Sequence, residues 1–237
     1  MSVRAASVFA GAVLGAHLLP SVLTIPAVCR RVAPQLSGLS SQSHVALTFD
    51  DGPDAVSTPA VLDTLAALDV RATFFVLGTQ VQAHPGVARR IVDEGHEIAV
   101  HGWVHTPHLL RAPWSVRADI AQTRACVADV CGVTPRFWRP PNGIVSGAGL
   151  AGAAALALRP VLWTADGRDW AADATSTSIA QRVGQRLEPG GVVLLHDSDI
   201  TSARDSWRRA LDALPVIVAD VRAHGWPIGP LREHWTE

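Results

Sequence analysis

Residues 44–53 read HVALTFDDGP, an apolar run that ends in two adjacent carboxylates and a Gly-Pro turn. The run His44–Asp50 has the length and composition of a buried strand. Adjacent side chains on an extended strand point to opposite faces, but a turn that follows at once can aim Asp50 and Asp51 at one site. The stretch therefore predicts a strand with two candidate functional residues at its carboxyl end.

Strand-like and helical segments alternate through the rest of the chain. Further strands are expected at residues 72–78, 97–101, 136–139, 159–164 and 191–196. Helices are expected from Thr58, with Pro59 at its first position, from Pro85 to Gly95, from Ser115 to the residue before Gly132, and over Ser206–His224 with an interruption at Pro215. Such alternation predicts an α/β fold with parallel strands, as either a barrel or an open sheet.

The composition suits one sizeable domain. The chain has 237 residues, of which 48% are hydrophobic and 17% charged, and its formal net charge is -1. This apolar content excludes a disordered chain, and the near-zero charge gives no electrostatic footprint for nucleic acid. No protein partner is indicated. The three cysteines argue against a disulfide framework, although Cys126 and Cys131 could pair in an exported protein.

Residues 5–28 form an apolar run with no ionisable side chain other than His17. We divide the chain into an apolar N-terminal segment at 1–32, a polar linker at 33–43 and a domain at 44–237. The apolar run is long enough for a signal anchor, so the sequence favours membrane association and an anchored or exported protein. Arg30 and Arg31 after the run oppose a simple anchor, and the alternative is a helix packed on a cytoplasmic protein.

Polar side chains capable of catalysis follow the ends of the predicted strands. They are Asp50 and Asp51, His101 and His105, Arg139, Asp166 and Asp169, and His196 and Asp197. In parallel α/β folds that edge gathers side chains from different strands into one pocket. The sequence therefore predicts a single site built from several strand ends.

Two histidines and an aspartate have the composition of a metal site. His101 and His105 are four residues apart and can share one ion if the backbone turns helically. Asp51 would complete a set of two nitrogens and one carboxylate that leaves positions for water and substrate. This is the ligand set of a hydrolytic metal centre, to which Zn²⁺ is best suited, while Co²⁺, Ni²⁺ or Mn²⁺ would fit the same residues.

Two further segments supply groups that could assist such a centre. The turn RPPNG at residues 139–143 is fixed by two prolines, so Arg139 can orient a carboxylate and the Asn142 N–H can point into the pocket. His196 ends a wholly apolar strand and is a suitable proton donor if an acid partners it.

The motifs TFDDGP, H-x3-H, RPPNG, D-x2-DW and LLH occur in this order over about residues 44–232. Together they resemble the five motifs of the polysaccharide deacetylase family, also called the NodB-homology domain or carbohydrate esterase family 4. The resemblance implies an irregular (β/α)7-type barrel, here preceded by the apolar N-terminal helix. It also implies an enzyme that removes N-acetyl, and in some members O-acetyl, groups from glycans such as chitin and peptidoglycan.

Carried over residue by residue, the resemblance implies a role for each motif. The implied metal ligands are Asp51, His101 and His105. The implied proton carriers are Asp50 as general base and His196 as general acid, held by Arg139 and Asp169 respectively. The implied substrate contacts are Asn142, through its N–H, and Pro141, Trp170 and Leu194.

The chain departs from the family pattern at two positions. Gly102 stands where the family usually has Ser or Thr after the first histidine, and Asn142 stands where it usually has an aromatic residue. Neither change removes a catalytic atom, so both bear on substrate choice rather than on activity.

We therefore expect a metal-dependent hydrolase that removes N-acetyl groups from an N-acetylated glycan, an amino-sugar polymer or oligomer. Three alternatives stay open at this point. The same centre could act on a non-polymeric amide or an O-acetyl ester, or the chain could be a carbohydrate-binding relative without activity. It could also be a glycosidase that uses two of Asp50, Asp166 and Asp169.

Overall fold

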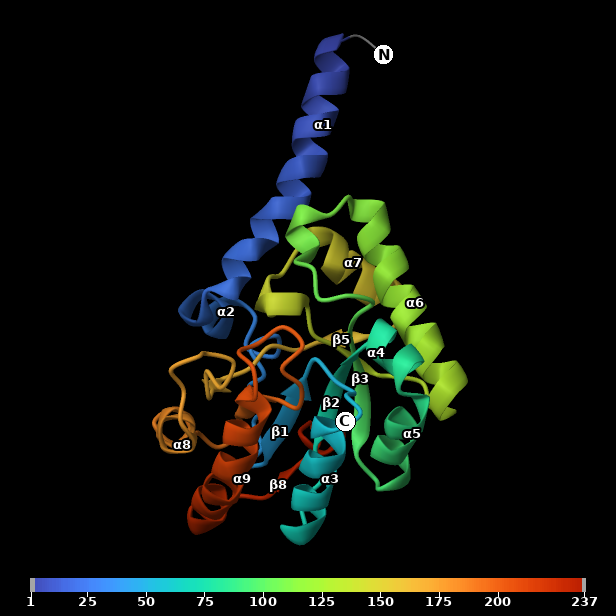
Figure 1. Ribbon diagram of the computed structural model, residues 1–237. Helices are drawn as coiled ribbons and strands as arrows, with labels where there is room; N and C mark the ends of the chain where they lie inside the picture. The colour runs from blue at the N-terminus through green and yellow to red at the C-terminus, as the bar shows by residue number, and fades with distance from the viewer. Residues whose placement is uncertain (1–2, 236–237) are drawn as a thin grey trace.

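A computed structural model describes residues 3–235, with side chains from residue 11 onward. Its centre is a sheet of eight parallel strands within those residues (Figure 1). The strands are β1 (Val45–Asp50), β2 (Thr73–Leu77), β3 (Glu97–Gly102), β4 (Phe137–Trp138), β5 (Arg159–Pro160), β6 (Ala165–Asp166), β7 (Val192–His196) and β8 (Ile228–Gly229). Their order is β5-β4-β3-β2-β1-β7-β6, and β8 pairs with β1.

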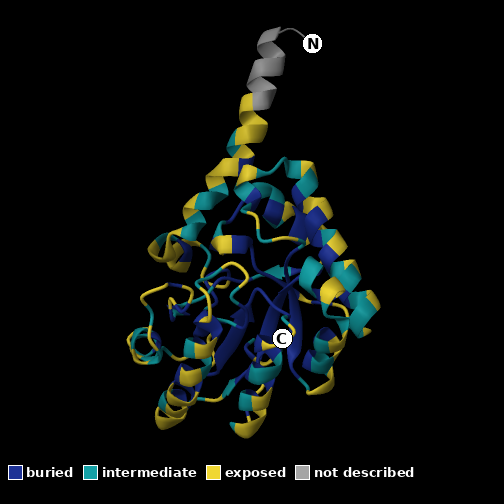
Figure 2. Cartoon of the chain, in the orientation of Figure 1, coloured by how far each residue is buried: buried dark blue, intermediate teal, exposed yellow. Residues whose placement is uncertain are grey.

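The sheet is an open half-barrel, since no pairing joins β5 to β6 among residues 3–235. Strands β1, β2 and β3 are buried along their whole length, because helices cover the sheet (Figure 2). Buried on both sides, they carry continuous apolar runs rather than an alternating pattern. This architecture confirms the expected α/β fold of the irregular (β/α)7 type.

Helices connect successive strands and pack around the sheet. They are α3 (Ser57–Ala67), α4 (Gly78–Ala83), α5 (Pro85–Asp93), α6 (Pro113–Cys131), α7 (Gly147–Ala155), α8 (Ser176–Gly184) and α9 (Ser206–Ala223). Short 3-10 turns are η2 (His108–Leu110), η3 (Pro141–Gly143) and η4 (Leu231–Glu233). The main core fills the space between the sheet and these helices, with Phe49, Phe74 and Leu214 fully buried there.

Two predicted helix starts and one predicted interruption of a helix differ from the structure. Helix α3 begins at Ser57 rather than at a Thr58 cap, because the Asp54 carboxylate accepts the Val56 and Ser57 N–H groups and frees Thr58 for another contact. Helix α6 begins at Pro113, before the predicted Ser115. Helix α9 continues through Pro215, since buried residues on both sides of the proline hold it against the core.

The strand predicted at residues 159–164 is also wrong as a single element. Strand β5 stops at Pro160, and the Leu162 N–H donates to the Leu36 carbonyl instead of to a strand. The chain then reaches the other edge of the sheet, where β6 pairs with β7. One apolar run therefore crosses from one end of the half-barrel to the other.

The N-terminal segment consists of α1 (Val3–Leu18), η1 (Leu19–Thr24) and α2 (Pro26–Val32). Helix α1 projects from one end of the domain, while α2 lies against its side (Figure 1). From residue 11 onward the apolar side chains of this segment are largely exposed, including Leu14 and Leu19. No single helix in the described part of the chain is long and apolar enough to cross a membrane, and the one pair that passes together is bent by 103° near Ile25. Membrane association through residues 5–28 stays a prediction, which co-sedimentation of the full chain with lipid vesicles would test.

Residues 33–43, predicted as a linker, lie against the domain. Leu36 and Ser37 are buried, and the Ser40 N–H donates to the Gly190 carbonyl. The N-terminal segment is thereby tied to the domain at its carboxyl end. The three cysteines are all free thiols, so Cys126 and Cys131 do not pair.

Candidate active site

The carboxyl ends of β1, β3 and β7 meet at one pocket of about 290 Å³. In the sheet register Asp50 lies beside His196, so residues far apart in the sequence become neighbours. The pocket is lined by Asp50, His101, His105, Asn142, Gly143, Trp163, Asp166, Trp170, Leu194, His196, Thr201 and Ser202. The predicted convergence of strand ends therefore holds for this edge of the sheet.

Asp51 and the two histidines form a compact group. The Asp51 Oδ1 atom lies 3.4 Å from His101 Nε2 and 3.5 Å from His105 Nε2. Asp51 has a φ of 84°, a left-handed conformation that turns its carboxylate toward the side on which Asp50 also lies. Both carboxylates thus face His101, since Asp50 Oδ2 is 3.8 Å from the same nitrogen.

This group fits a divalent cation. The Asp51 Oδ1 atom is buried and has no hydrogen-bond partner among the described residues, which is costly unless something else satisfies it. Two ligands that each lie about 2.1 Å from a tetrahedral ion are about 3.4 Å apart, which matches the separations found here. One atom each of Asp51, His101 and His105 lies within 4.8 Å of the others.

Neighbouring groups fix these ligands in the form that binds metal. The His101 Nδ1 atom is 3.0 Å from the Arg139 carbonyl, which leaves Nε2 facing Asp51. The Thr201 hydroxyl donates to Asp51 Oδ2. Burial opposes the charge of Asp51, but contact with His101 and the charge of His196 outweigh it and hold the pKa of that carboxyl below its usual range. Burial lowers the pKa of His105, which favours the neutral form that a ligand requires.

Asp50 is held by a completely buried arginine. Arg139 Nη1 donates to Asp50 Oδ1 at 2.7 Å and to the Thr48 hydroxyl at 2.9 Å. Its other nitrogens donate to the carbonyls of Val161 and Leu162. With every arm of the guanidinium fixed, Asp50 Oδ2 is left as the oxygen that faces the pocket.

His196 is held in the same way by Asp169. The backbone N–H of His196 donates to Asp169 Oδ2 at 2.7 Å, and the ring atom Nδ1 of His196 lies 2.9 Å from Asp169 Oδ1. Burial alone would lower the pKa of His196, but the charge and hydrogen bond of Asp169 outweigh it and raise that pKa to about 10. The imidazole is therefore protonated at neutral pH, with Nε2 free to act in the pocket.

The two histidines come together differently from the sequence expectation. His101 belongs to β3 and His105 to the bend that follows, so the segment between them is a loop rather than a helical turn. Asp119 of α6 holds this loop, because its Oδ1 accepts the Trp103 N–H at 2.9 Å and lies 3.2 Å from His108 Nε2. Arg111 donates to the other oxygen of Asp119.

Replacing Asp119 by Asn should weaken metal binding by about 10- to 100-fold, because the loop that carries His105 loses its charged anchor. The rate at saturating metal should change little, since no ligand or proton carrier is removed. Metal titration of the full-length variant measures this, with the exposed Asp129→Asn on the same helix as control. Unchanged metal affinity in Asp119→Asn would show that the loop does not need this anchor.

The predicted substrate contacts divide into two groups. Asn142, Trp170 and Leu194 line the pocket. Pro141 does not line it: it is buried, and its ring would lie 3.4 Å from a Cβ atom at Gly102. Pro141 therefore lies next to the loop that carries His101 and His105, and its contact with substrate stays a prediction.

Three residues that build the site have no role predicted from the sequence. Asp197 accepts the Gly52 N–H and the Thr58 hydroxyl, which anchors the turn after Asp51. Thr201 and Asp119 act on the metal ligands from outside the motifs. Asp197 carried a signal, because it follows His196 at the end of a predicted strand. Asp119 also carried one, because it is an acidic residue on the buried face of α6, three residues after Val116.

Sequence comparison places the chain among enzymes that act on acetylated glycans. A family model described as polysaccharide deacetylase matches residues 38–161. The chain is 39% identical over 205 residues to a chitooligosaccharide deacetylase of Bradyrhizobium, covering 81% of this chain and 91% of that one. It is 35% identical over 170 residues to a peptidoglycan N-acetylglucosamine deacetylase of Listeria monocytogenes, covering 72% of this chain but 36% of the longer relative.

Solved structures share the fold. A peptidoglycan N-acetylglucosamine deacetylase superposes with a TM-score of 0.78 at 31% identity, covering 84% of this chain and 91% of that one. A family 4 acetyl xylan esterase from Clostridium thermocellum, solved with a cobalt ion, gives 0.73 at 33% identity, covering 81% and 89%. A mutant of a family pseudoenzyme with restored activity also matches, with a TM-score of 0.74 at 25% identity, covering 83% and 70%. The fold alone therefore does not imply activity, which depends on the side chains of the site.

Proposed function

Because the chain belongs to the polysaccharide deacetylase family, we propose that it is a metal-dependent hydrolase that removes N-acetyl groups from amino-sugar glycans. The observation that carries this proposal is the buried Asp51–His101–His105 group beside a held carboxylate and a held imidazole. A relative without activity would not need all five side chains around one pocket. The relatives named as chitooligosaccharide and peptidoglycan deacetylases indicate the substrate class.

Asp51, His101 and His105 would hold one divalent ion, and the two-nitrogen, one-oxygen set favours Zn²⁺ over Co²⁺, Ni²⁺ or Mn²⁺. When bound, such an ion polarises the acetyl carbonyl and increases the acidity of water. The deeply buried Asp51 carboxylate would supply negative charge, and the ring nitrogens of His101 and His105 would supply lone pairs.

The remaining residues handle the protons. Asp50 Oδ2 takes a proton from the attacking water, while Arg139 keeps the other oxygen in place. His196 Nε2 gives its proton to the departing sugar nitrogen as the carbon–nitrogen bond breaks, because an amide nitrogen leaves only as an amine. The products are acetate and the free amino sugar. Asn142 and Trp170 are positioned to contact the sugar, and a role for the Asn142 N–H at the carbonyl oxygen stays a prediction.

Full-length protein loaded with Zn²⁺ should release acetate from chitooligosaccharides or from peptidoglycan fragments. Chelator treatment should abolish the release and added Zn²⁺ should restore it, since the Asp51 group without an ion cannot polarise the carbonyl. Acetate and new reducing ends are measured in the same reactions. Reducing ends without acetate would indicate a glycosidase instead, and binding without either product would indicate a carbohydrate-binding relative.

A further inference from the structure

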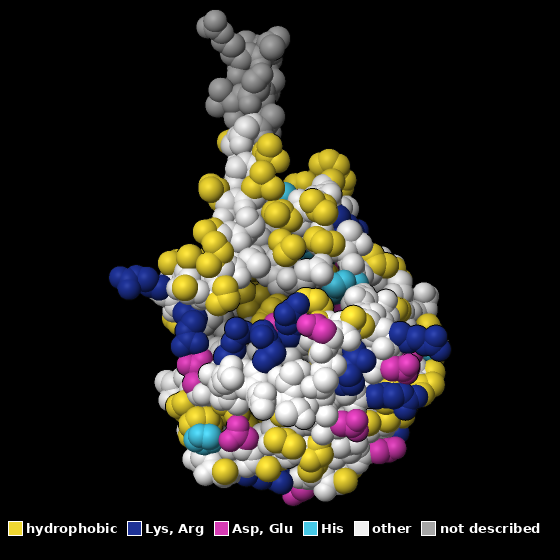
Figure 3. Space-filling model, turned by 60° about the vertical axis from the view of Figure 1, so that its left-hand side comes forward, with side chains coloured by type: hydrophobic (Ala, Val, Ile, Leu, Met, Phe, Trp, Pro, Cys, Tyr) yellow, Lys and Arg dark blue, Asp and Glu magenta, His cyan; other side chains and the backbone are white. Residues whose placement is uncertain are grey.

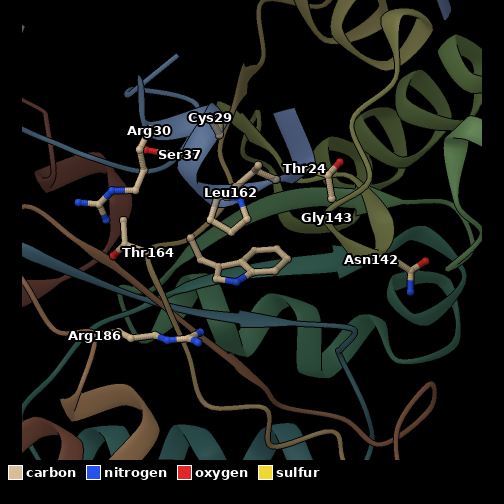
Figure 4. Close-up of a pocket in the computed structure, with 11 residues that line it drawn as sticks. Thr24, Cys29, Arg30, Ser37, Asn142, Gly143, Leu162, Thr164 and Arg186 are labelled. Carbon is tan, nitrogen blue, oxygen red and sulfur yellow. The ribbon is translucent and has the colours of Figure 1, made fainter. Parts of the chain in front are cut away.

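A second cavity, of about 370 Å³, adjoins the active-site pocket. Asn142, Gly143 and Trp163 line both, so the two share a wall. The N-terminal segment forms much of the rest, and the close-up in Figure 4 shows its residues around the cavity. The residues that line only this second cavity are Thr24, Pro26, Cys29, Arg30, Ser37, Leu162, Thr164 and Arg186.

The N-terminal wall is built into the domain rather than loosely apposed. Cys29 and Leu36 are buried in one apolar cluster with Val145 and Leu162. The Thr24 hydroxyl accepts the Val145 N–H at 3.2 Å. The cavity is therefore enclosed by segments that pack on one another, and it lies next to the loop that carries Asn142.

Trp163 offers a flat apolar surface at the boundary of the two cavities. It is partly exposed, and its ring packs so closely on Gly143 that a Cβ atom there would lie 2.5 Å from it. Gly143 also has a φ of +66°, so glycine is required for both reasons. Behind the ring, the Arg139 guanidinium carbon lies 5.6 Å from its centroid. Because Trp163 lines both cavities and is partly exposed, part of its flat apolar ring is accessible for a sugar to stack on.

The polar lining of the second cavity is cationic. Two arginines and no carboxylate line it. Arg30 is neutralised by a two-pronged ion pair with Glu188, at 2.5 and 2.8 Å. Arg186 has no hydrogen bond or ion pair from its side chain to any residue in the described part of the chain, and its guanidinium points toward the cavity (Figure 4). Figure 3 shows basic side chains gathered on this face, below the N-terminal helices.

We propose that this cavity is a second glycan subsite that binds a sugar bearing a carboxylate, through stacking on Trp163 and an ion pair with Arg186. An unpaired guanidinium matches a planar carboxylate, and Glu188 keeps Arg30 from competing for it. The substrate would then be a glycan in which the N-acetylated sugar to be hydrolysed lies next to an acidic sugar. This inference rests on the proposed function and narrows it.

The test compares two oligosaccharides of equal length with the full-length protein. One is uncharged, a chitooligosaccharide, and the other alternates N-acetylglucosamine with a carboxylate-bearing N-acetylmuramyl sugar. Arg186→Gln should lower kcat/KM for the acidic substrate about 5- to 10-fold, mainly through KM, and should change the uncharged substrate less than about 2-fold. Arg186→Glu should reduce the acidic substrate further, and salt should reduce the wild-type preference.

The matched control is Arg89→Gln, which removes an exposed arginine on α5, outside both cavities. Calorimetric binding of both oligosaccharides provides a readout that does not require turnover. If Arg186→Gln binds and hydrolyses both sugars as the wild type does, or weakens both equally, the subsite is refuted. If no acetate is released but only the acidic oligosaccharide loses affinity in Arg186→Gln, the subsite stands and the proposed activity fails.

Discussion

Replacing Asp51 by Asn should remove the metal ion and reduce acetate release by about 10³-fold or more. Stabilisation by a metal ion is worth several kcal/mol, and each 1.36 kcal/mol corresponds to about a tenfold change in rate. Asn keeps the size of the side chain but loses the charge that lies 3.4 Å from His101 and 3.5 Å from His105. The measurement is metal content by elemental analysis together with kcat for acetate release.

The control for this variant is Asp63→Asn, which neutralises an exposed carboxylate on α3 and should leave both quantities unchanged. Thermal unfolding of both variants shows whether the fold is retained. A folded Asp51→Asn protein with full metal content and full activity would contradict the assignment of Asp51 as a ligand.

Replacing Asp169 by Asn should move the alkaline limb of the kcat profile to lower pH. Burial opposes the charge of His196, but the charge and hydrogen bond of Asp169 raise its pKa to about 10; without Asp169, burial lowers that pKa and only the charges of Asp51 and Asp50 still raise it. At pH 8 a smaller fraction of the variant imidazole than of the wild-type imidazole is therefore protonated. Activity at pH 8 should therefore fall about 10²- to 10⁴-fold, the worth of a general acid, and recover in part toward pH 6.

His196→Ala distinguishes this account from simple damage to the site. It should lower kcat by about the same factor at pH 8 but without recovery at lower pH, since no imidazole is left to protonate. The exposed Asp173→Asn, from the same loop as Asp169, is the control and should keep the wild-type profile. An unchanged alkaline limb in Asp169→Asn would show that His196 is not the acid.

The same pair contributes to stability with a defined sign. The folded-state pKa of His196 lies above its ordinary value, so the contribution is complete below about pH 6.5 and is lost as the pH rises toward 10.

The strand ends were predictable from the sequence because local signals determine them. Apolar runs of five or six residues that end in charged side chains are visible without any knowledge of distant contacts, as at Asp50 and His196. The failures are at Leu162 and Pro215, where tertiary contacts override a local signal. Leu162 leaves its strand to pair with Leu36, and the helix continues through Pro215 because both flanks are buried.

The residues that face one another in the site were predictable from the sequence, while the residues that hold them in position were not. Two adjacent aspartates and a spaced histidine pair indicate a metal centre, but nothing in the sequence shows that Thr201 reaches Asp51 or that Asp119 holds the histidine loop. These contacts join segments 150 and 16 residues apart. The sequence also did not predict that Thr24 and Cys29 line the second cavity. An apolar N-terminal run has the same composition whether it enters a membrane or packs on a domain.

Anomalous diffraction from crystals of the full chain grown with Zn²⁺ tests the central claim most directly. The account predicts one strong peak between β1 and β3, about 2.1 Å from an Asp51 oxygen and from the Nε2 atoms of His101 and His105. A peak bound to other residues, or no peak at this position in crystals of active enzyme, would contradict it.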